Sequence, residues 1–240
     1  MRRYTSTLLW LPLLLLSLSF LLINPRSVHT QPVQPHKFIA ITFDDGPSPL
    51  ATPQILSSLS RYRAHATFFV LGSQMTKYPQ LVRKIINQGS MVANHGWQHL
   101  NLQKTSPSTL WKDAHRTFAE ASRLHVPMAR LYRPPYGYTS PALLHAFAQQ
   151  HVRVVLWSID TRDWSGPGTN AIVNKVLQHV KNGSIVLLHD GGGRRTQTIE
   201  ALDIILNVLT EKGYHLVTLS RLLKNLPNSN TGPIVRLPNS

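Results

Sequence analysis

The sequence predicts an α/β fold of the parallel, barrel-like kind, and two observations carry this prediction. Short apolar stretches typical of buried strands alternate along the chain with stretches whose apolar residues recur at helical spacing. Several of the strand-like stretches end in Asp, Arg or His, and parallel barrels gather their functional side chains at the carboxyl ends of their strands. No internal repeat of fixed period indicates a solenoid or a propeller.

The expected elements begin with the apolar run Phe38–Ile41, which continues through Thr42 and Phe43 and stops at the turn Gly46-Pro47. Apolar spacing and Gly or Pro punctuation then mark out the rest. These further elements are a helix at 52–60, a strand at 66–70, a helix at 79–87 that stops at Gly89, a helix at 108–124, a short apolar segment that ends at Arg133, a strand at 154–160, a strand at 184–190, a helix through 199–209 closed by Gly213, and a strand at 215–219 that leads into a short terminal helix.

Two adjacent carboxylates, Asp44 and Asp45, lie where the first strand meets its turn. Neighbouring residues of a strand point to opposite sides, so the two can have different tasks, one as a metal ligand and the other facing substrate or water. Asp, Gly and Pro also favour turns for local reasons, so this motif alone is compatible with a simple turn. The segments further along the chain favour a functional role for these two carboxylates.

A pair of imidazoles, His95 and His99, supplies the second feature. A spacing of four on a helical turn would direct both rings to one side, where they can share an ion. Two neutral His and one carboxylate form an open ligand set for a catalytic divalent metal, with a further position left for water. The chain has twelve His, so one such pair can arise by chance. Its combination with the Asp44-Asp45 strand end favours a metal site.

Three further strand ends also finish in chemically active side chains. Arg133 precedes a rigid Pro-Pro and a Gly turn, and its guanidinium could clamp one of the early carboxylates. The strand at 154–160 ends in Asp160 and continues into Thr161–Trp164, and the strand at 184–190 ends in His189-Asp190 before three glycines. Each segment alone could be an ordinary loop, but four such strand ends favour one shared site.

The motifs together resemble those of polysaccharide deacetylases with a NodB homology domain, over roughly residues 37–223. All five family motifs occur in order: Thr42-Phe43-Asp44-Asp45-Gly46-Pro47, His95-Gly96-Trp97-Gln98-His99, Arg133-Pro134-Pro135-Tyr136-Gly137, Asp160-Thr161-Arg162-Asp163-Trp164, and Leu188-His189 with Val186 before it. The resemblance implies a distorted (β/α) barrel of about seven strands, one divalent metal ion and removal of acetyl groups from N-acetylated sugars. Zinc is the expected ion, with Co²⁺ or another divalent ion as the alternative.

The resemblance also implies a role for each matching residue. Asp44 would be the general base, oriented by Arg133, and His189 the general acid, oriented by Asp163 or by Asp160. The implied metal ligands are Asp45, His95 and His99.

Four more residues complete the implied site. The backbone N–H of Tyr136 would help to stabilise the oxyanion. The implied substrate contacts are Pro134, Trp164 and Leu187, the last two around the acetyl methyl group. One position departs from the family pattern, because Gly96 stands where Ser or Thr often follows the first His. That hydroxyl supports the loop and does not bind the metal, so the departure puts only the rigidity of the loop in question.

Amide hydrolysis by these residues is chemically coherent. A metal polarises the carbonyl and acidifies water, a carboxylate removes the proton of that water, and preorganised donors hold the oxyanion. A His is suited to protonate the departing amine near neutral pH. No Ser or Cys nucleophile is needed, and the chain has no Cys.

Composition agrees with an exported single-domain protein of 240 residues. The formal charge is +15, and about +12 remains after the three arginines that precede the folded region. Such a surface attracts polyanions, either nucleic acid or cell-wall polymers with carboxylates and phosphates. No nucleic-acid recognition motif or basic helix is present, so we expect no nucleic-acid partner.

The N-terminus predicts export. Met1-Arg2-Arg3 is a positive start, and 8–23 is almost wholly apolar but short for a membrane span. Residues 1–30 are therefore a signal peptide or, because no Ala-x-Ala site follows, an uncleaved membrane anchor. We expect a linker at 31–36, the deacetylase domain at 37–224 and a flexible tail at 225–240, with the domain secreted or anchored outside the cytoplasm.

The expected substrate is a polymer of N-acetylglucosamine, first of all peptidoglycan. Aromatic residues near the motif loops offer flat faces for sugar rings: Trp97, Tyr136, Tyr138 and Trp164. Chitin oligomers and acetylated xylan are alternative substrates, and a carbohydrate-binding protein without turnover is a further alternative. The presence of both Asp44 and His189 argues against this last possibility.

Overall fold

The computed structural model describes residues 36–101, 104–226 and 234–235. The expected leader at 1–30 and all of the expected linker except His36 lie outside the described residues. Within the described part, no helix is long and apolar enough to cross a membrane.

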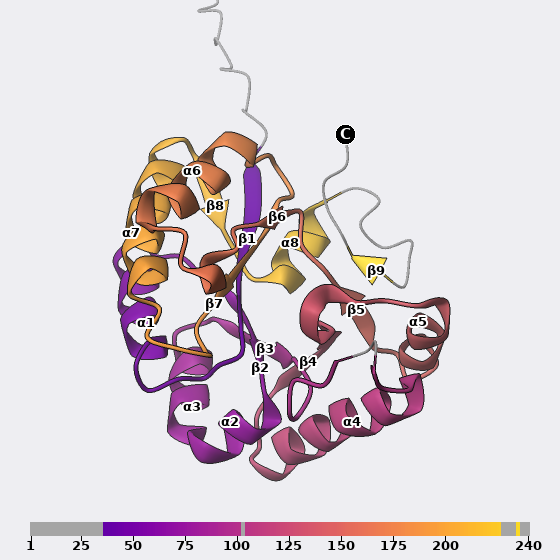
Figure 1. Ribbon diagram of the computed structural model, residues 1–240. Helices are drawn as coiled ribbons and strands as arrows, with labels where there is room; N and C mark the ends of the chain where they lie inside the picture. Colours follow the sequence, from indigo (N-terminus) through magenta and orange to yellow (C-terminus); the bar gives the residue numbers. More distant parts are fainter. Residues whose placement is uncertain (1–35, 102–103, 227–233, 236–240) are drawn as a thin grey trace, which may run out of the picture. The chain divides into compact units, whose positions relative to one another are not determined.

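Parallel strands form a distorted half barrel in the order β6-β7-β1-β2-β3-β4-β5 (Figure 1). Two short strands extend this sheet, since β8 pairs with the first half of β1 and β9 pairs with β5. The strands are β1 (Lys37–Asp44), β2 (Thr67–Val70), β3 (Met91–Asn94), β4 (Met128–Tyr132), β5 (Arg153–Val155), β6 (Ile159–Asp160), β7 (Ile185–His189), β8 (Tyr214–Leu216) and β9 (Ile234–Val235). The expected barrel of about seven parallel strands is therefore confirmed, with two short additions.

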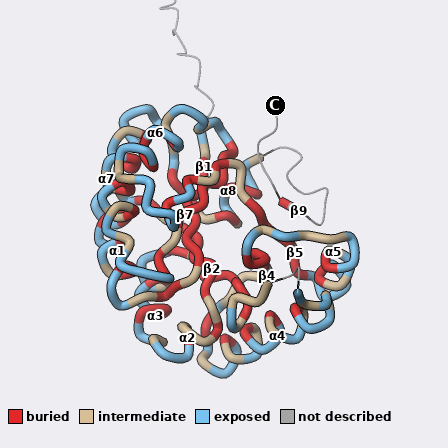
Figure 2. The backbone as a smooth tube through the Cα atoms, in the orientation of Figure 1, coloured by how far each residue is buried: buried red, intermediate tan, exposed pale blue. Residues whose placement is uncertain are grey.

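Helices connect the strands and cover the outer side of the sheet. They are α1 (Thr52–Arg61), α2 (Gly72–Lys77), α3 (Pro79–Asn87), α4 (Pro107–Arg123), α5 (Pro141–Ala148), α6 (Thr169–His179), α7 (Thr196–Glu211) and α8 (Leu219–Asn225). Helices α6 and α7 pack against each other and α1 packs against α7, while α4 and α5 pack together near β4 and β5 (Figure 1). The strands lie in the buried interior, and the exposed backbone belongs mainly to these outer helices (Figure 2).

Strand β1 shows how the alternation of side chains positions the site. Its residues Ile39, Ile41 and Phe43 pack in the large apolar cluster that joins the sheet to the outer helices. Ala40 belongs to a second cluster on the other face. Because side chains alternate along a strand, Asp44 shares this inner face with Ala40.

The register of the strands brings the motif residues to one level. Asp44 is the direct partner of His189 on β7 and of Phe69 on β2. On the other side, Asn94 of β3 is the partner of Tyr132 on β4. The segments that follow these strands therefore start at the same edge, where parallel folds place their sites.

Two expectations about elements were wrong. The segment 154–160 is not one strand, because β5 pairs with β4 at one end of the sheet and β6 pairs with β7 at the other. Residues 156–158 join the two strands across the open side of the half barrel. Part of the expected tail is ordered as well, since Val235 of β9 is buried and its strand pairs with β5.

Candidate active site

A cavity of about 430 Å³ opens at the carboxyl ends of the strands. It is lined by Asp44, Asp45, His95, His99, Pro134, Tyr136, Tyr138, Trp157, Asp160, Trp164, Leu187 and His189. Nine of the residues that the sequence predicted for the site are therefore brought together here. The remaining two, Arg133 and Asp163, contact Asp44 and His189 respectively.

Arg133 holds Asp44 inside the barrel. Its Nη1 donates to Oδ1 of Asp44 at 2.7 Å and to the hydroxyl of Thr42 at 2.8 Å. Its Nε and Nη2 donate to the carbonyl oxygens of Val155, at the end of β5, and Leu156, in the segment that joins β5 to β6. The Arg133 side chain is fully buried, so these contacts fix one carboxylate oxygen of Asp44.

A compact donor set surrounds Asp45. Its Oδ1 lies 3.4 Å from Nε2 of His95 and 3.3 Å from Nε2 of His99, and all three ligand atoms lie within 4.8 Å of one another. This oxygen is buried and has no hydrogen-bond partner among the described residues. A buried, unpartnered carboxylate oxygen between two ring nitrogens fits a divalent cation, which would satisfy all three donors.

The protonation of His95 agrees with a ligand role. Its Nδ1 lies 2.8 Å from the carbonyl oxygen of Arg133. A carbonyl only accepts hydrogen bonds, so Nδ1 carries a proton, and in the neutral ring the lone pair of Nε2 faces Asp45. Burial opposes the charged form of this ring, but the charges of Asp44 and Asp45 outweigh it and raise the pKa of His95. Burial and the neighbouring His95 lower the pKa of His99.

The two histidines come together through a loop and not through the expected helical turn. Residues 95–99 follow β3 as irregular backbone, with left-handed φ values of 84° at Gly96 and 58° at His99. The N–H of Gly96 donates to Asn94, and Asp113 of α4 accepts from the N–H of Trp97. A Cβ at Gly96 would lie 2.5 Å from Oδ2 of Asp113, so this loop is braced by a carboxylate at the place where the family pattern has a hydroxyl.

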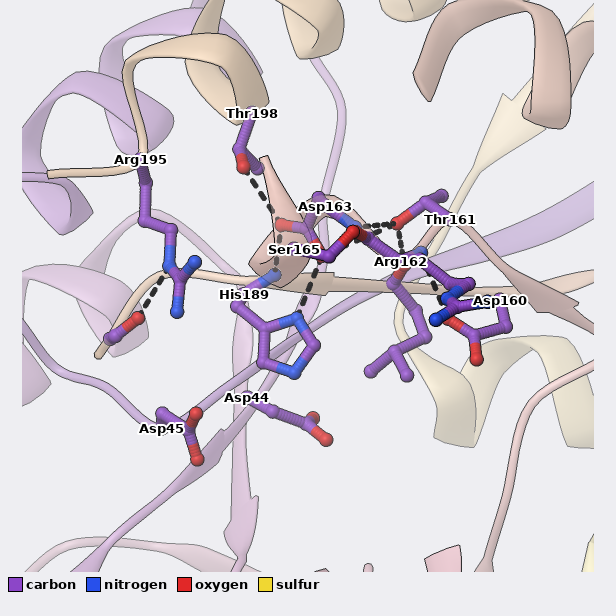
Figure 3. A network of polar contacts seen from close by, with 12 residues as sticks. Asp44, Asp45, Asp160, Thr161, Arg162, Asp163, Ser165, His189, Arg195 and Thr198 are labelled. Atoms are coloured by element: carbon purple, nitrogen blue, oxygen red, sulfur yellow. Dashed lines mark hydrogen bonds and ion pairs between the residues drawn. The ribbon is translucent and has the colours of Figure 1, made fainter. Parts of the chain in front are cut away.

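His189 is held by Asp163 (Figure 3). Its Nδ1 lies 2.8 Å from Oδ1 of Asp163, and its backbone N–H donates to Oδ2 at 2.9 Å. Thr198 of α7 donates to the same Oδ2. Asp160 instead accepts from the N–H of Arg162 and lines the cavity, so the structure places Asp163, and not Asp160, against His189.

The electrostatic balance of this pair favours a charged His189. Burial opposes the imidazolium, but the hydrogen bond and the charge of Asp163 outweigh it and raise the pKa of His189. Burial likewise opposes the carboxylate of Asp163, and the contact with His189 lowers its pKa. His189 therefore carries a proton at higher pH than an ordinary histidine, as a general acid requires.

The backbone is strained at several of these positions. Asp45, His99 and Tyr136 all adopt left-handed φ values, of 73°, 58° and 60°. Such conformations are uncommon for residues other than glycine and cluster at functional sites. The turn at Asp45 also lets both carboxylates reach one cavity, although they follow each other in the chain.

Sequence reasoning missed some residues of the site and misplaced one. Trp157 lines the cavity, and the only indication of this in the sequence was its position near the end of the expected strand at 154–160. Trp97 does not line it, because its ring packs beneath the guanidinium of Arg116 at 3.8 Å and against Gly72.

Asp190 is a second missed residue, although it follows His189 directly. The carboxyl of Asp190 is fully buried. Thr52 donates to its Oδ2 at 2.5 Å, and its Oδ1 has no hydrogen-bond partner among the described residues. Burial, together with the charges of Asp45 and Asp44, raises its pKa to about 7.

A parallel half barrel that carries an Asp-His-His cluster beside a buried Arg–Asp pair and a His–Asp pair has the residue types of a hydrolase that uses a divalent metal. The model of the family described as polysaccharide deacetylase matches residues 31–155. The chain therefore belongs to the polysaccharide deacetylase family, in which deacetylation depends on a metal, and it is a polysaccharide deacetylase.

Individual relatives support this family assignment. A peptidoglycan-N-acetylglucosamine deacetylase of Bacillus cereus is 43% identical over 192 residues, which cover 78% of this chain and 89% of that protein. A chitooligosaccharide deacetylase of Bradyrhizobium is 36% identical over 197 residues, covering 77% of this chain and 90% of that one. The structure of the peptidoglycan deacetylase PdaC from Bacillus subtilis superposes with a TM-score of 0.73 at 38% identity, covering 80% of this chain and 93% of that one.

Proposed function

We propose that the protein is a zinc-dependent N-deacetylase that acts outside the cytoplasm on N-acetylglucosamine units of peptidoglycan. One observation carries the catalytic part of the proposal. A candidate base, Asp44, and a candidate acid, His189, face the same cavity, and each has its own orienting partner. A protein that only binds carbohydrate has no need for such a pair.

Asp44 is the proposed general base. Because Arg133 occupies its Oδ1, its Oδ2 is left to take the proton of the attacking water. A divalent ion held by Asp45, His95 and His99 would polarise the acetyl carbonyl and lower the pKa of water. The division of labour follows from the contacts, since Arg133 binds Asp44 whereas the two histidine nitrogens lie nearer to Asp45.

His189 is the proposed general acid. Its Nδ1–H is donated to Asp163, so Nε2 is the nitrogen that gives a proton to the departing amine. The backbone N–H of Tyr136 is proposed to donate to the oxyanion that forms when water adds to the carbonyl. The residues proposed to contact the acetyl group and its sugar are Pro134, Trp164 and Leu187.

Exposed rings and charge support a cell-wall glycan as the substrate. Tyr136, Trp164 and Tyr138 are 58%, 53% and 39% exposed although all three line the cavity, as suits stacking on sugar faces. The net positive charge of the chain favours an anionic polymer over a neutral one. The name of the Bacillus cereus relative points the same way.

The proposed location of the protein and one alternative substrate rest on other observations. The apolar leader of the sequence supports export or anchoring, and action on a cell wall requires it. Chitin oligomers are the second candidate substrate, because the Bradyrhizobium relative acts on chitooligosaccharides by its name and the same cavity suits either amide.

The test uses the full chain loaded with zinc. It is incubated with purified peptidoglycan, chitin oligomers and acetylated xylan, and both acetate and free glucosamine are quantified. We expect acetate and free amine in equal amounts from peptidoglycan. Acetate from xylan alone would overturn the amide assignment, and release from chitin oligomers alone would keep the chemistry and refute the peptidoglycan proposal.

A further inference from the structure

A second cavity, of about 230 Å³, adjoins the catalytic one, and Trp164 lines both. It is lined by Asp163, Trp164, Gly166, Arg195, Thr196, Gln197 and Thr198. Gly166, Arg195, Thr196 and Gln197 of this second cavity have no part in the proposed hydrolysis. A polymer that places one sugar over the metal ligands would extend a neighbouring sugar past Trp164 toward this cavity.

Arg195 is the only cation in the described lining of the second cavity. It lies at the end of the glycine loop that follows His189, with a left-handed φ of 55° (Figure 3). Its Nε donates to the carbonyl oxygen of Gly191 at 2.6 Å, which anchors the side chain. Its two terminal nitrogens have no hydrogen bond to any described residue, so the outer fork of the guanidinium is available to a ligand.

No carboxylate of the described residues forms an ion pair with that fork. Both oxygens of Asp163 already accept hydrogen bonds, from His189 and from Thr198 among others. Glu200 accepts from Thr169. A second guanidinium, that of Arg162, lies over the ring of Trp164 at 5.7 Å, so a second positive charge lies beside this ring.

The glycine loop keeps Arg195 in place. A Cβ at Gly192 would lie 2.8 Å from Nη2 of Arg195 and 3.6 Å from Oδ2 of Asp45. Glycine at this position therefore lets the guanidinium lie close to the loop, on the same side of the molecule as the catalytic residues.

We propose that Arg195 binds a carboxylate on the sugar next to the one that is deacetylated. This inference rests on the proposed function and names the feature of the polymer that the protein selects. A guanidinium fork matches a carboxylate with two parallel hydrogen bonds, and charge-assisted bonds of this kind are the stronger ones. In peptidoglycan every second sugar carries a lactyl group whose carboxyl is either free or joined by an amide bond to a peptide that ends in a carboxylate, whereas chitin has neither.

The carboxylate has two possible sources, the lactyl group itself or a peptide attached to it. Four substrates separate them: glycan strands with peptides, strands stripped of peptides so that the lactyl carboxylates are free, stripped strands with these groups converted to methylamides, and neutral N-acetylglucosamine oligomers. The variant is Arg195→Gln in the zinc-loaded full chain. Arg194→Gln is the matched control, because this neighbouring arginine is exposed and does not line the cavity.

We expect Arg195→Gln to raise KM about tenfold for the strands that carry the recognised carboxylate and to change kcat little, as suits loss of one charge-assisted contact. If Arg195 binds the lactyl carboxylate, KM should rise on the stripped strands. If Arg195 binds a carboxylate of the peptide, KM should rise only on the peptide-bearing strands. KM for methylamide strands and neutral oligomers should stay within about twofold. Arg194→Gln should behave as the unchanged protein on all four substrates.

Two outcomes would overturn the inference. An equal loss on charged and neutral substrates would show that Arg195 acts on the site through Gly191 or Asp45. An equal effect of Arg194→Gln would show that only the general surface charge matters. Strand affinities, measured by calorimetry in an Asp44→Asn background, test Arg195 without turnover, so failure of the proposed reaction remains distinguishable from failure of this contact.

Discussion

Arg133 and Asp44 form a buried ion pair, with Nη1 and Oδ1 2.7 Å apart and side chains 0% and 4% exposed. The pair joins β4 to β1 across the interior of the half barrel, and the same guanidinium reaches the segment that leads from β5 to β6. One side chain therefore joins β1 to the end of β5 and the segment that follows it, and it orients the candidate base. Deleting either side chain would leave the other charge buried without this hydrogen-bond partner, which is strongly destabilising, whereas Asp44→Asn keeps an oxygen that accepts from Arg133.

Asp44→Asn should keep the metal and lose most turnover. The amide has nearly the same size but cannot accept a proton from water, and general acid–base steps contribute about 10²–10⁴-fold. We therefore expect kcat to fall by that order while metal content, measured by elemental analysis, stays near one per chain. Loss of metal together with activity would show that Asp44 is a ligand and that its division of labour with Asp45 is wrong.

Asp45→Ala, His95→Ala and His99→Ala should each abolish tight metal binding, because each removes one of three protein ligands. Elemental analysis of folded protein, checked by circular dichroism, measures this. In the unchanged protein, affinity should weaken as pH falls, since protons compete for the ligands and the pKa of His95 is raised. Near-stoichiometric zinc in all three variants would refute the ligand assignment.

Asp163→Asn should move the alkaline limb of the kcat/KM profile to lower pH. The general acid must be protonated, and Asp163 raises the pKa of His189 against the effect of burial. Without this charge the imidazole loses its proton at lower pH, so the variant should lose more activity at pH 8 than at pH 6. Asp160→Asn is the matched control and should leave the limb in place; the reverse result would assign the orienting role to Asp160.

Asp190→Asn should stabilise the protein at neutral and alkaline pH. The folded-state pKa of about 7 lies above the ordinary value of 3.8, so the folded protein holds a proton that the unfolded chain has lost between these limits. Stability from this group is full below pH 4 and is lost as pH rises through 7. The gain in Tm of the variant should therefore grow from pH 4 to pH 8, at about 2–4 °C for each kcal/mol.

The surface variant Asp203→Asn provides the comparison, because that carboxylate is partly exposed and pairs with Arg61. It should show no advantage that grows with pH. Bound zinc should reduce the effect of Asp190→Asn, since the ion offsets the charge of Asp45, one of the charges that raise the pKa of Asp190. A Tm difference that stays constant across this pH range would contradict the prediction.

The sequence by itself determined which segments supply the residues of the candidate site. Apolar runs that end in Asp44, Arg133 and His189 identified the strand ends, because burial of a parallel strand requires such runs and its end is where polar groups can reach solvent. The helix expected at 79–87 has these bounds in the structure, since Pro and Gly punctuate it locally. Local chemistry of this kind is encoded within a few residues.

Tertiary structure alone decided how those segments meet. Asp44 and His189 are 145 positions apart in the sequence numbering, and only the register of β1 against β7 makes them partners. The approach of His95 and His99 depends on left-handed backbone in a loop braced by Asp113, not on their spacing of four. Packing also selected Asp163 over Asp160 as the partner of His189 and buried the carboxyl of Asp190. Strand register, left-handed turns and burial depend on contacts between distant parts of the chain, so no local pattern of residues could have specified them.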